Sequence, residues 1–420
     1  MIHGQLYIFL ACLFGLLMTW GVGANDLANV MSTSIGSKAI SIRQAIIIAV
    51  IFEFTGAFLG GIQVSDTIRH GIINTDMLNQ APQLFIYGML AALLAGMTWM
   101  SLASIFGLPV SITHTIIGAI VGFGAIVLGF GALQWHQVKV IAISWVTSPG
   151  IAGVFAYLLF ISVQRTILSK TNPFYFAKRY APIYLFLIGV AMSLASVTRG
   201  LEHMGVPLTV IDKIIISVGL GLFITLIGSL MIRKIQIKPD ATRQQHFATT
   251  EKIFGVLMLF TAASMVFAHG SNDVAIAVGP IAAVVSVVQA GGSLAGTQQI
   301  PYWTVFLGAL GVVIGLLTYG RNVISTVGNN ITMLTPSRAF AATLSAAFTV
   351  VLATGTGIPV SATQTLVGAV LGVGLARGIG ALNLTIIRNI FMSWILTIPA
   401  GALFAVGYFY VLKTAFHWYH

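Results

Sequence analysis

The chain has 420 residues, of which 57% are hydrophobic and only 7% are charged. Soluble domains carry roughly 25% charged residues, so this composition excludes a large soluble domain and predicts a membrane protein. The formal net charge of +11 would also suit a nucleic-acid-binding protein, but membrane proteins concentrate Lys and Arg in cytoplasmic loops, and we expect no nucleic-acid partner. The single cysteine, Cys12, excludes an internal disulfide and a cysteine-based metal site.

Twelve apolar segments are predicted to be membrane spans, and all but one approach or exceed the roughly 20 residues that a transmembrane helix needs. In chain order the predicted spans are 5–24, 43–64, 84–104, 116–133, 138–162, 182–198, 212–232, 251–269, 302–320, 338–356, 366–376 and 386–412. The first lacks a positively charged start and a small-residue cleavage site, so we expect a mature helix and no signal peptide. The eleventh is short, and we expect it to borrow from 357–365. The sequence predicts an all-α polytopic membrane protein with about twelve transmembrane helices.

Lys and Arg are distributed unequally over the loops between these spans. Of the 20 residues, all but five fall on one side of the predicted membrane, and those five are Arg69, Lys139, Arg199, Lys213 and Lys413. The excess of positive charge marks the cytoplasmic side. We therefore expect a multi-pass protein of the plasma membrane, and of the inner membrane in a bacterium, with both termini outside.

Two uncommon motifs each occur twice. The sequence G-A-N-D at Gly23–Asp26 returns as G-S-N-D at Gly270–Asp273. The sequence G-L-P-V-S-I-T-H-T at Gly107–Thr115 returns as G-I-P-V-S-A-T-Q-T at Gly357–Thr365. Smaller echoes support the duplication, because the pair Ser-Trp at 144–145 recurs at 393–394. A duplicated polar site inside a membrane protein is typical of transporters built from internal repeats.

The duplication divides the chain into three parts. We predict a first repeat at 1–165, a connecting pair of helices with a cytoplasmic loop at 166–250, and a second repeat at 251–420. An odd number of predicted spans lies between the starts of the two repeats, so the second enters the membrane from the opposite side. The prediction is an inverted-topology pair with the site at the repeat interface.

The duplicated Asn-Asp pair predicts a cation site. Asp26 and Asp273 are the only formally charged residues of long apolar stretches, and a carboxylate within a membrane costs several kcal/mol unless it is paired or bound to a cation. We expect a helix break after Gly21 and Gly23 that places Asp26 within the membrane. The predicted ligands of Na⁺ are the four side chains Asn25, Asp26, Asn272 and Asp273. The alternative is a protonated Asp that forms hydrogen bonds within the bundle.

The Pro-Val-Ser segments predict an anion site. Gly107 and Gly357 can end a helix, and Pro109 and Pro359 suit the first turn of the next one. The predicted fold is therefore a pair of broken helices or re-entrant hairpins whose N–H groups and positive dipole ends face an anion. The hydroxyl groups at these helix starts belong to Ser111, Thr113, Thr115, Ser361, Thr363 and Thr365. The alternative is a kinked helix whose hydroxyls bond to its own carbonyls.

Three other polar residues lie in predicted spans or beside the motifs. Glu53 is a third acid within the membrane, and it fits a proton or cation site and a neutral core glutamate equally well. His114 lies within the first hydroxyl cluster, and a structural or hydrogen-bonding role is favoured over metal binding, because no second His or Cys accompanies it. His269 precedes the second Asn-Asp pair, and we expect it to be a packing residue.

These motifs resemble the signatures of the inorganic phosphate transporter (PiT) family. The resemblance covers nearly the whole chain and implies secondary active transport of orthophosphate by alternating access, coupled to Na⁺ or H⁺, with no enzymatic activity and no cofactor beyond the transported ions. It assigns the Asn-Asp pairs to cations and the Ser/Thr residues to phosphate. The chain departs from the family at Gln364, which replaces a His, and at Ile276, where the first repeat has Asn29. The sequence around Glu53 and Thr67–Ile72 is more similar to sodium-coupled members.

Several functions compete with sodium-coupled import of phosphate. A proton-coupled phosphate permease, or a permease for sulfate or another oxyanion, would have the same fold, because the sequence does not separate two tetrahedral anions. An intramembrane aspartyl protease would need two carboxylates sharing one proton about 3 Å apart, and it would leave the hydroxyl clusters without a role. A passive channel would not need paired ion sites. The predicted partners are phosphate, sodium ions and the bilayer. The sequence does not decide whether the protein forms a homo-oligomer.

Overall fold

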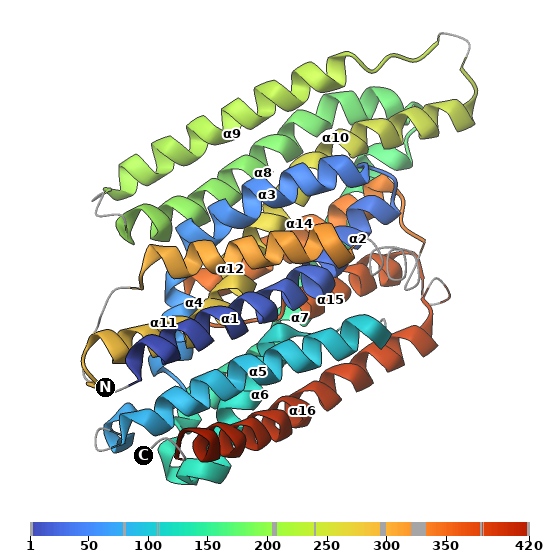
Figure 1. The fold of residues 1–420 in the computed structure, drawn as a ribbon. Helices are drawn as coiled ribbons and strands as arrows, with labels where there is room; N and C mark the ends of the chain where they lie inside the picture. The colour runs from blue at the N-terminus through green and yellow to red at the C-terminus, as the bar shows by residue number, and fades with distance from the viewer. Residues whose placement is uncertain are drawn as a thin grey trace.

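The computed structural model describes residues 3–78, 81–106, 108, 110–203, 208–238, 241–294, 300–320, 333–378, 380 and 382–417. Within these ranges the chain is helical, and its only extended pairing is an isolated bridge between Ile73 and Leu133. The helices run roughly parallel or antiparallel to one another in a single bundle (Figure 1). The predicted all-α fold is confirmed.

The first part of the chain forms α1 (Gly4–Val22), η1 (Gly23–Leu27), α2 (Ala28–Gly36), α3 (Ile42–Gly60), α4 (Ile62–His70), η2 (Thr75–Leu78), α5 (Pro82–Phe106), α6 (Ile112–Phe123), η3 (Gly124–Leu128), η4 (Phe130–Ala132), α7 (Trp135–Val163) and η5 (Gln164–Leu168). Two helices follow, α8 (Pro173–His203) and α9 (Val210–Arg233). The last part forms α10 (Arg243–His269), η6 (Gly270–Val274), α11 (Ala275–Gln289), α12 (Tyr302–Gly315), η7 (Leu316–Gly320), α14 (Pro336–Gly355), α15 (Ala362–Ala376) and α16 (Leu384–His417).

Each of the twelve predicted spans falls on one of these helices. Nine described helices are long and apolar enough to cross a membrane, and two shorter apolar helices cover 112–128 and 362–376. Three helices were missed. After the first and second Asn-Asp turns the chain continues directly as α2 and as α11, and α4 follows α3 after a single residue. The spans predicted before α2 and α11 end too early because the chain stays helical through the polar motif.

The helix pairs α5–α6 and α14–α15 are hairpins, as predicted for the two Pro-Val-Ser segments. The N–H of Asn74 donates to the carbonyl of Ala132 at 2.8 Å, so the chain before α5 lies beside the chain after α6. At the other hairpin, Arg338 and Arg377 both donate to the carbonyl of Met333, at 3.0 and 3.5 Å. Each hairpin therefore returns to the end of the bundle from which it starts.

The first and last parts of the chain run in opposite directions and interlock. In Figure 1, α1 starts at the end of the bundle where α11 finishes. The second helix of each hairpin packs against the last helix of the other part, α15 against α7 and α6 against α16. A Cβ atom on Gly368 would overlap the backbone of Pro149, and one on Gly118 would overlap the backbone of Ile398. Gly118 and Gly368 stand three residues after Thr115 and Thr365, so they are equivalent positions of the duplicated segments. They allow equivalent close contacts, as inverted repeats require, while the repeat boundaries stay a prediction.

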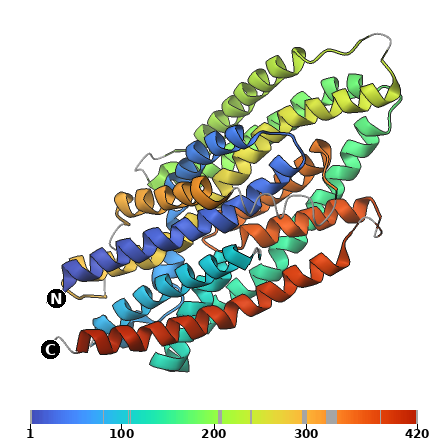
Figure 2. The ribbon, with the colours of Figure 1, turned by 45° about the vertical axis from the view of Figure 1, so that its right-hand side comes forward.

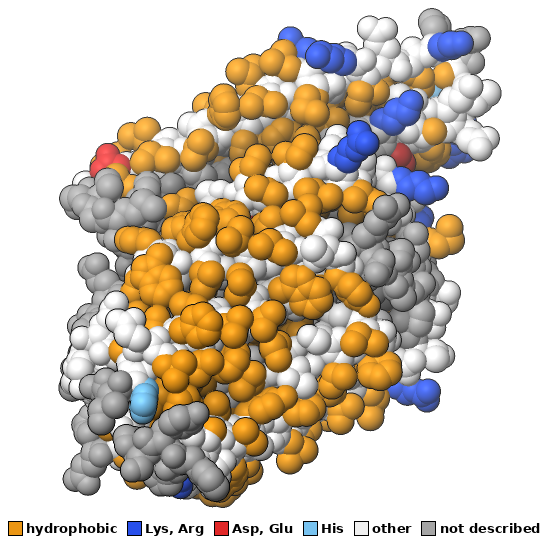
Figure 3. Space-filling model, viewed as in Figure 1, with side chains coloured by type: hydrophobic (Ala, Val, Ile, Leu, Met, Phe, Trp, Pro, Cys, Tyr) orange, Lys and Arg blue, Asp and Glu red, His pale blue; other side chains and the backbone are white. Residues whose placement is uncertain are grey.

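The surface has the character of a membrane protein. A broad hydrophobic face runs along the helices, and the visible Lys and Arg side chains gather mainly at one end (Figure 3). Both termini lie at the opposite end of the bundle (Figures 1 and 2). The chain is therefore a multi-pass membrane protein whose positively charged end is opposite its termini.

Candidate functional site

Both Asn-Asp pairs lie on wide π-helical turns. Residues 23–27 form η1 between α1 and α2, and residues 270–274 form η6 between α10 and α11. The predicted break after Gly21 and Gly23 is therefore wrong, because the backbone stays helical and inserts one turn with a wider hydrogen-bond pattern. Such turns occur inside α-helices frequently at functional sites. Gly23 and Gly270 permit the turns to approach other helices, since a Cβ on either would overlap neighbouring backbone.

The first Asn-Asp pair contacts both hairpins. The side-chain amide of Asn25 donates to the carbonyl of Leu108 at 3.1 Å, in the turn of the first hairpin. Oδ2 of Asp26 accepts the N–H of Ile112, the first residue of α6, at 3.0 Å. Oδ1 of Asp26 accepts the hydroxyl of Thr363, on the second hairpin, at 2.8 Å. The carboxylate is 1% exposed, so it lies at a sealed junction between the two hairpins.

The second Asn-Asp pair contacts the turn of the second hairpin. The amide of Asn272 donates to the carbonyl of Val360 at 2.6 Å, and its oxygen accepts the N–H of the same residue at 3.2 Å. Thr113, on the first hairpin, donates to that carbonyl at 2.8 Å. The structure therefore places Asn25, Asp26 and Asn272 at the starts of α6 and α15. Asp273 accepts the side-chain amide of Asn272 at 2.6 Å.

The six predicted hydroxyl residues fall into three equivalent pairs. Ser111 and Ser361 are the N-caps of α6 and α15, and each accepts the backbone N–H three residues later, at 3.4 and 3.2 Å. Thr113 and Thr363 donate to the other part of the chain, Thr113 to the carbonyl of Val360 and Thr363 to the carboxylate of Asp26. Thr115 and Thr365 donate to the carbonyls of Ser111 and Ser361, at 2.9 and 2.7 Å. Thr115 and Thr365 therefore follow the alternative interpretation, in which a hydroxyl bonds to a carbonyl of its own helix.

Glu53 and His269 form a buried polar pair beside the second Asn-Asp turn. Nδ1 of His269 lies 2.7 Å from Oε1 of Glu53. Nε2 of His269 lies 3.1 Å from Oδ2 of Asp273, at ion-pair distance but out of line for a hydrogen bond. All three side chains are almost fully buried. The expectation that His269 is a packing residue is wrong, and its position four residues before Asp273 on one helical face was the available signal.

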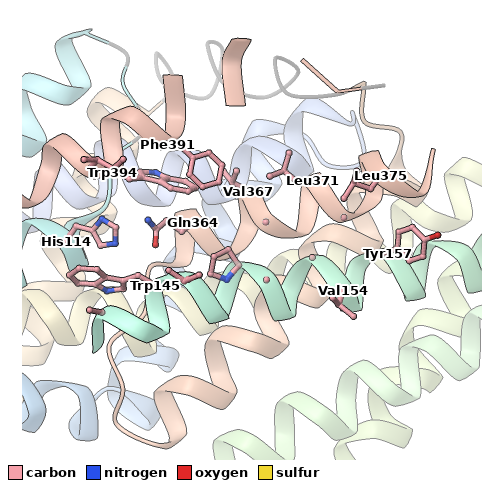
Figure 4. A pocket seen from close by; sticks show the side chains of 18 of the residues that line it. His114, Trp145, Val154, Tyr157, Gln364, Val367, Leu371, Leu375, Phe391 and Trp394 are labelled. Atoms are coloured by element: carbon pink, nitrogen blue, oxygen red, sulfur yellow. The ribbon is translucent and has the colours of Figure 1, made fainter. Parts of the chain in front are cut away.

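His114 lies beside the site but faces away from it. Together with Gln364, its counterpart on the second hairpin, it borders a groove of about 700 Å³ between α7, α15 and α16. Figure 4 shows the two side chains between the indoles of Trp145 and Trp394, which belong to the repeated Ser-Trp pairs. The ring of His114 lies 4.1 Å from that of Trp145. This placement agrees with a structural role, and the groove is otherwise largely apolar.

Among its described residues, the site offers oxygen ligands and helix starts but no Lys or Arg. Within the described residues, no group of three or more His, Cys, Asp and Glu side chains could hold a metal ion, so a cation here would depend on amide, carboxylate and backbone oxygens. The N-terminal ends of α6 and α15 supply N–H groups suited to an anion. Gly107 and Pro109 lie outside the described residues.

Three comparisons with known proteins bear on this site. The model of the phosphate transporter family matches residues 22–405. A protein of Haemophilus influenzae, assigned provisionally as a phosphate permease, is 46% identical over 418 residues, covering 99% of both chains. The chloroplastic inorganic phosphate transporter 2-1 of Arabidopsis thaliana is 39% identical over 433 residues, which cover 97% of this chain and 72% of that one. A solved structure described as the sodium-dependent phosphate transporter has 34% identity and a TM-score of 0.89, covering 97% of this chain and 99% of that one.

Proposed function

The chain belongs to the phosphate transporter family, and from this premise we propose that it imports inorganic phosphate by sodium-coupled symport with alternating access. The observation that carries the proposal is the convergence of two Asn-Asp turns and two hairpin starts at one buried junction. Hairpins that enter from opposite ends and meet within the bundle suit a site exposed to one side at a time. The family supports transport and argues against an enzyme such as an aspartyl protease.

The proposed cation site is formed by Asn25, Asp26, Asn272 and Asp273. Asp26 accepts two hydrogen bonds but has no described Lys or Arg beside it, and a buried carboxylate is stabilised strongly by a bound cation. Asp273 differs, because it lies beside His269. Sodium is favoured over protons because the similar solved structure is described as sodium-dependent. Glu53 contributes to coupling, in this proposal, by holding His269 next to Asp273.

The proposed phosphate site lies between the starts of α6 and α15. Ser111, Thr113, Ser361 and Thr363 supply hydroxyls, and Thr115 and Thr365 lie one turn further along each helix. Backbone N–H groups at two helix starts neutralise a dianion without a fixed positive side chain. A ligand held in this way is not locked by an ion pair, which suits a site that must also release it.

Uptake into proteoliposomes tests the proposed function. With radiolabelled phosphate, an inward Na⁺ gradient at equal pH is expected to drive accumulation above the equilibrium level. An inward H⁺ gradient in Na⁺-free buffer is expected to drive none. Accumulation with the H⁺ gradient alone would show that transport is coupled to protons and not to sodium. If sulfate lowers the uptake of labelled phosphate as much as the same concentration of unlabelled phosphate does, the protein is a general oxyanion permease and not a phosphate transporter.

The proposed orientation places both termini outside and the Lys/Arg-rich end in the cytoplasm. The basis is the excess of Lys and Arg at the end opposite the termini. Replacing Arg243 by cysteine in a Cys12→Ser protein, in intact cells, should give a site that a membrane-impermeant thiol reagent does not reach until the cells are opened. Labelling of position 243 in intact cells would show that this end of the protein faces outside, opposite to the proposed orientation.

A further inference from the structure

A polar cavity lies away from the starts of α6 and α15, where the proposed phosphate site is placed. It has a volume of about 700 Å³ and is bordered by the end of α7 with η5, the start of α10 and both ends of the α14–α15 hairpin. Its polar lining consists of Gln164, Ser169, Gln244, Glu251, Thr335, Ser337, Arg338 and Arg377. It belongs to the Lys/Arg-rich end of the bundle, and none of its residues takes part in the site described above.

Two guanidinium groups stand side by side on one wall of this cavity. Nη1 of Arg338 donates to the carbonyl of Met333 at 3.0 Å, and Nη1 of Arg377 lies 3.5 Å from the same oxygen. The two positively charged guanidinium groups therefore lie close to each other, because they share one carbonyl oxygen. Such an arrangement is costly unless an anion or solvent screens it.

Glu251, the one carboxylate that lines the cavity, accepts hydrogen bonds from Ser337. The backbone N–H and the hydroxyl of Ser337 donate to the two oxygens of Glu251, at 2.8 and 2.7 Å. Glu251 therefore caps the start of α14, where a negative charge is favoured by the helix dipole. With two guanidinium groups against one carboxylate, the cavity lining is net positive.

We propose that this cavity binds a phosphate group, either of orthophosphate or of an anionic lipid headgroup. Guanidinium groups form paired hydrogen bonds with phosphate oxygens, and the amides of Gln164 and Gln244 with the hydroxyl of Ser169 can complete the donor set. The volume lies within the range of ligand pockets, roughly 300–1,000 Å³. The orthophosphate source rests on the proposed transport function, whereas the lipid source does not.

The test compares two charge-matched double variants. Arg338→Gln with Arg377→Gln removes both guanidinium groups of the cavity. Arg165→Gln with Arg179→Gln removes two exposed arginines that do not line it. In phosphatidylcholine nanodiscs without Na⁺, binding of ³²P-orthophosphate is measured by equilibrium dialysis. In nanodiscs that also contain phosphatidylglycerol, the number of retained phosphatidylglycerol molecules is counted by native mass spectrometry.

The cavity variant is expected to weaken binding at least about tenfold per arginine removed, the loss that follows when a hydrogen bond to a charged group is removed. The control variant should behave as the unaltered protein. A loss in the dialysis arm identifies orthophosphate, and a loss in the lipid arm identifies the headgroup. Equal behaviour of both variants in both arms overturns the proposal. Neither arm measures uptake, so failure of the proposed transport function would be seen separately.

Discussion

Replacing Asp26 by asparagine is expected to abolish sodium-driven phosphate uptake, to the level of protein-free liposomes. The carboxylate joins three parts of the molecule, because it lies on η1 and accepts the N–H of Ile112 and the hydroxyl of Thr363. Asparagine keeps one acceptor but removes the charge that a cation requires. The same loss is expected for Asp273→Asn, which also leaves His269 without its second acidic neighbour.

A charge-matched control separates coupling from general damage. Asp212→Asn removes a carboxylate from the exposed capping box at the start of α9, and uptake should stay close to that of the unaltered protein. Thermal unfolding in detergent should show that Asp26→Asn still folds, since a neutral amide is no harder to bury than a carboxylate. Uptake that keeps its full Na⁺ dependence in both Asp26→Asn and Asp273→Asn would remove these residues from the coupling site.

Removing the hydroxyl of Ser111 or Ser361 is expected to weaken phosphate binding by similar amounts. Each hydrogen bond to a charged ligand contributes about 1.5–3 kcal/mol, so each alanine variant should lose roughly 10- to 150-fold in affinity. Similar losses are expected because the two serines occupy equivalent N-cap positions on α6 and α15. Isothermal titration of the purified variants at saturating Na⁺ measures the effect.

The loss of an N-cap needs its own control. An N-cap serine replaced by alanine costs about 0.5–2 kcal/mol of stability, which could lower binding indirectly. Thr209 is also an N-cap, at the start of α9 and exposed, so Thr209→Ala makes the same kind of change away from the site. Its phosphate affinity should be unchanged. If Ser111→Ala and Ser361→Ala bind as tightly as Thr209→Ala, or if only one of them weakens binding, phosphate is not shared between the two hairpins.

The sequence predicted much of this site because polar residues are rare in the chain. Asn25 and Asp26 stood out against apolar neighbours, and the duplication linked them to the hairpins that the structure places beside them. The spans followed from hydropathy, since all but the eleventh are apolar stretches near the length of a bilayer crossing. The short helix α15 was also expected to begin within 357–365, and it begins at Ala362.

The remaining features depend on contacts that no local pattern encodes. Gly21 and Gly23 suggested a break, but the same residues also permit a continuous helix with a π turn, and packing decides between the two. The contact of His269 with Glu53 joins residues 216 positions apart. The hydroxyl of Thr363 could have bonded to its own helix, as that of Thr365 does, and only the approach of Asp26 distinguishes them.

The most direct test of a phosphate site shared by the two hairpins is the position of a bound tetrahedral oxyanion. Arsenate has the geometry of phosphate, and crystals grown with arsenate and Na⁺ give an anomalous signal at the arsenic edge. A shared site predicts that the strongest peak lies between the starts of α6 and α15, within about 3 Å of hydrogen-bond donors on both hairpins, Ser111 and Ser361 among them. A strongest peak that contacts one hairpin alone, or that lies away from both, would contradict it.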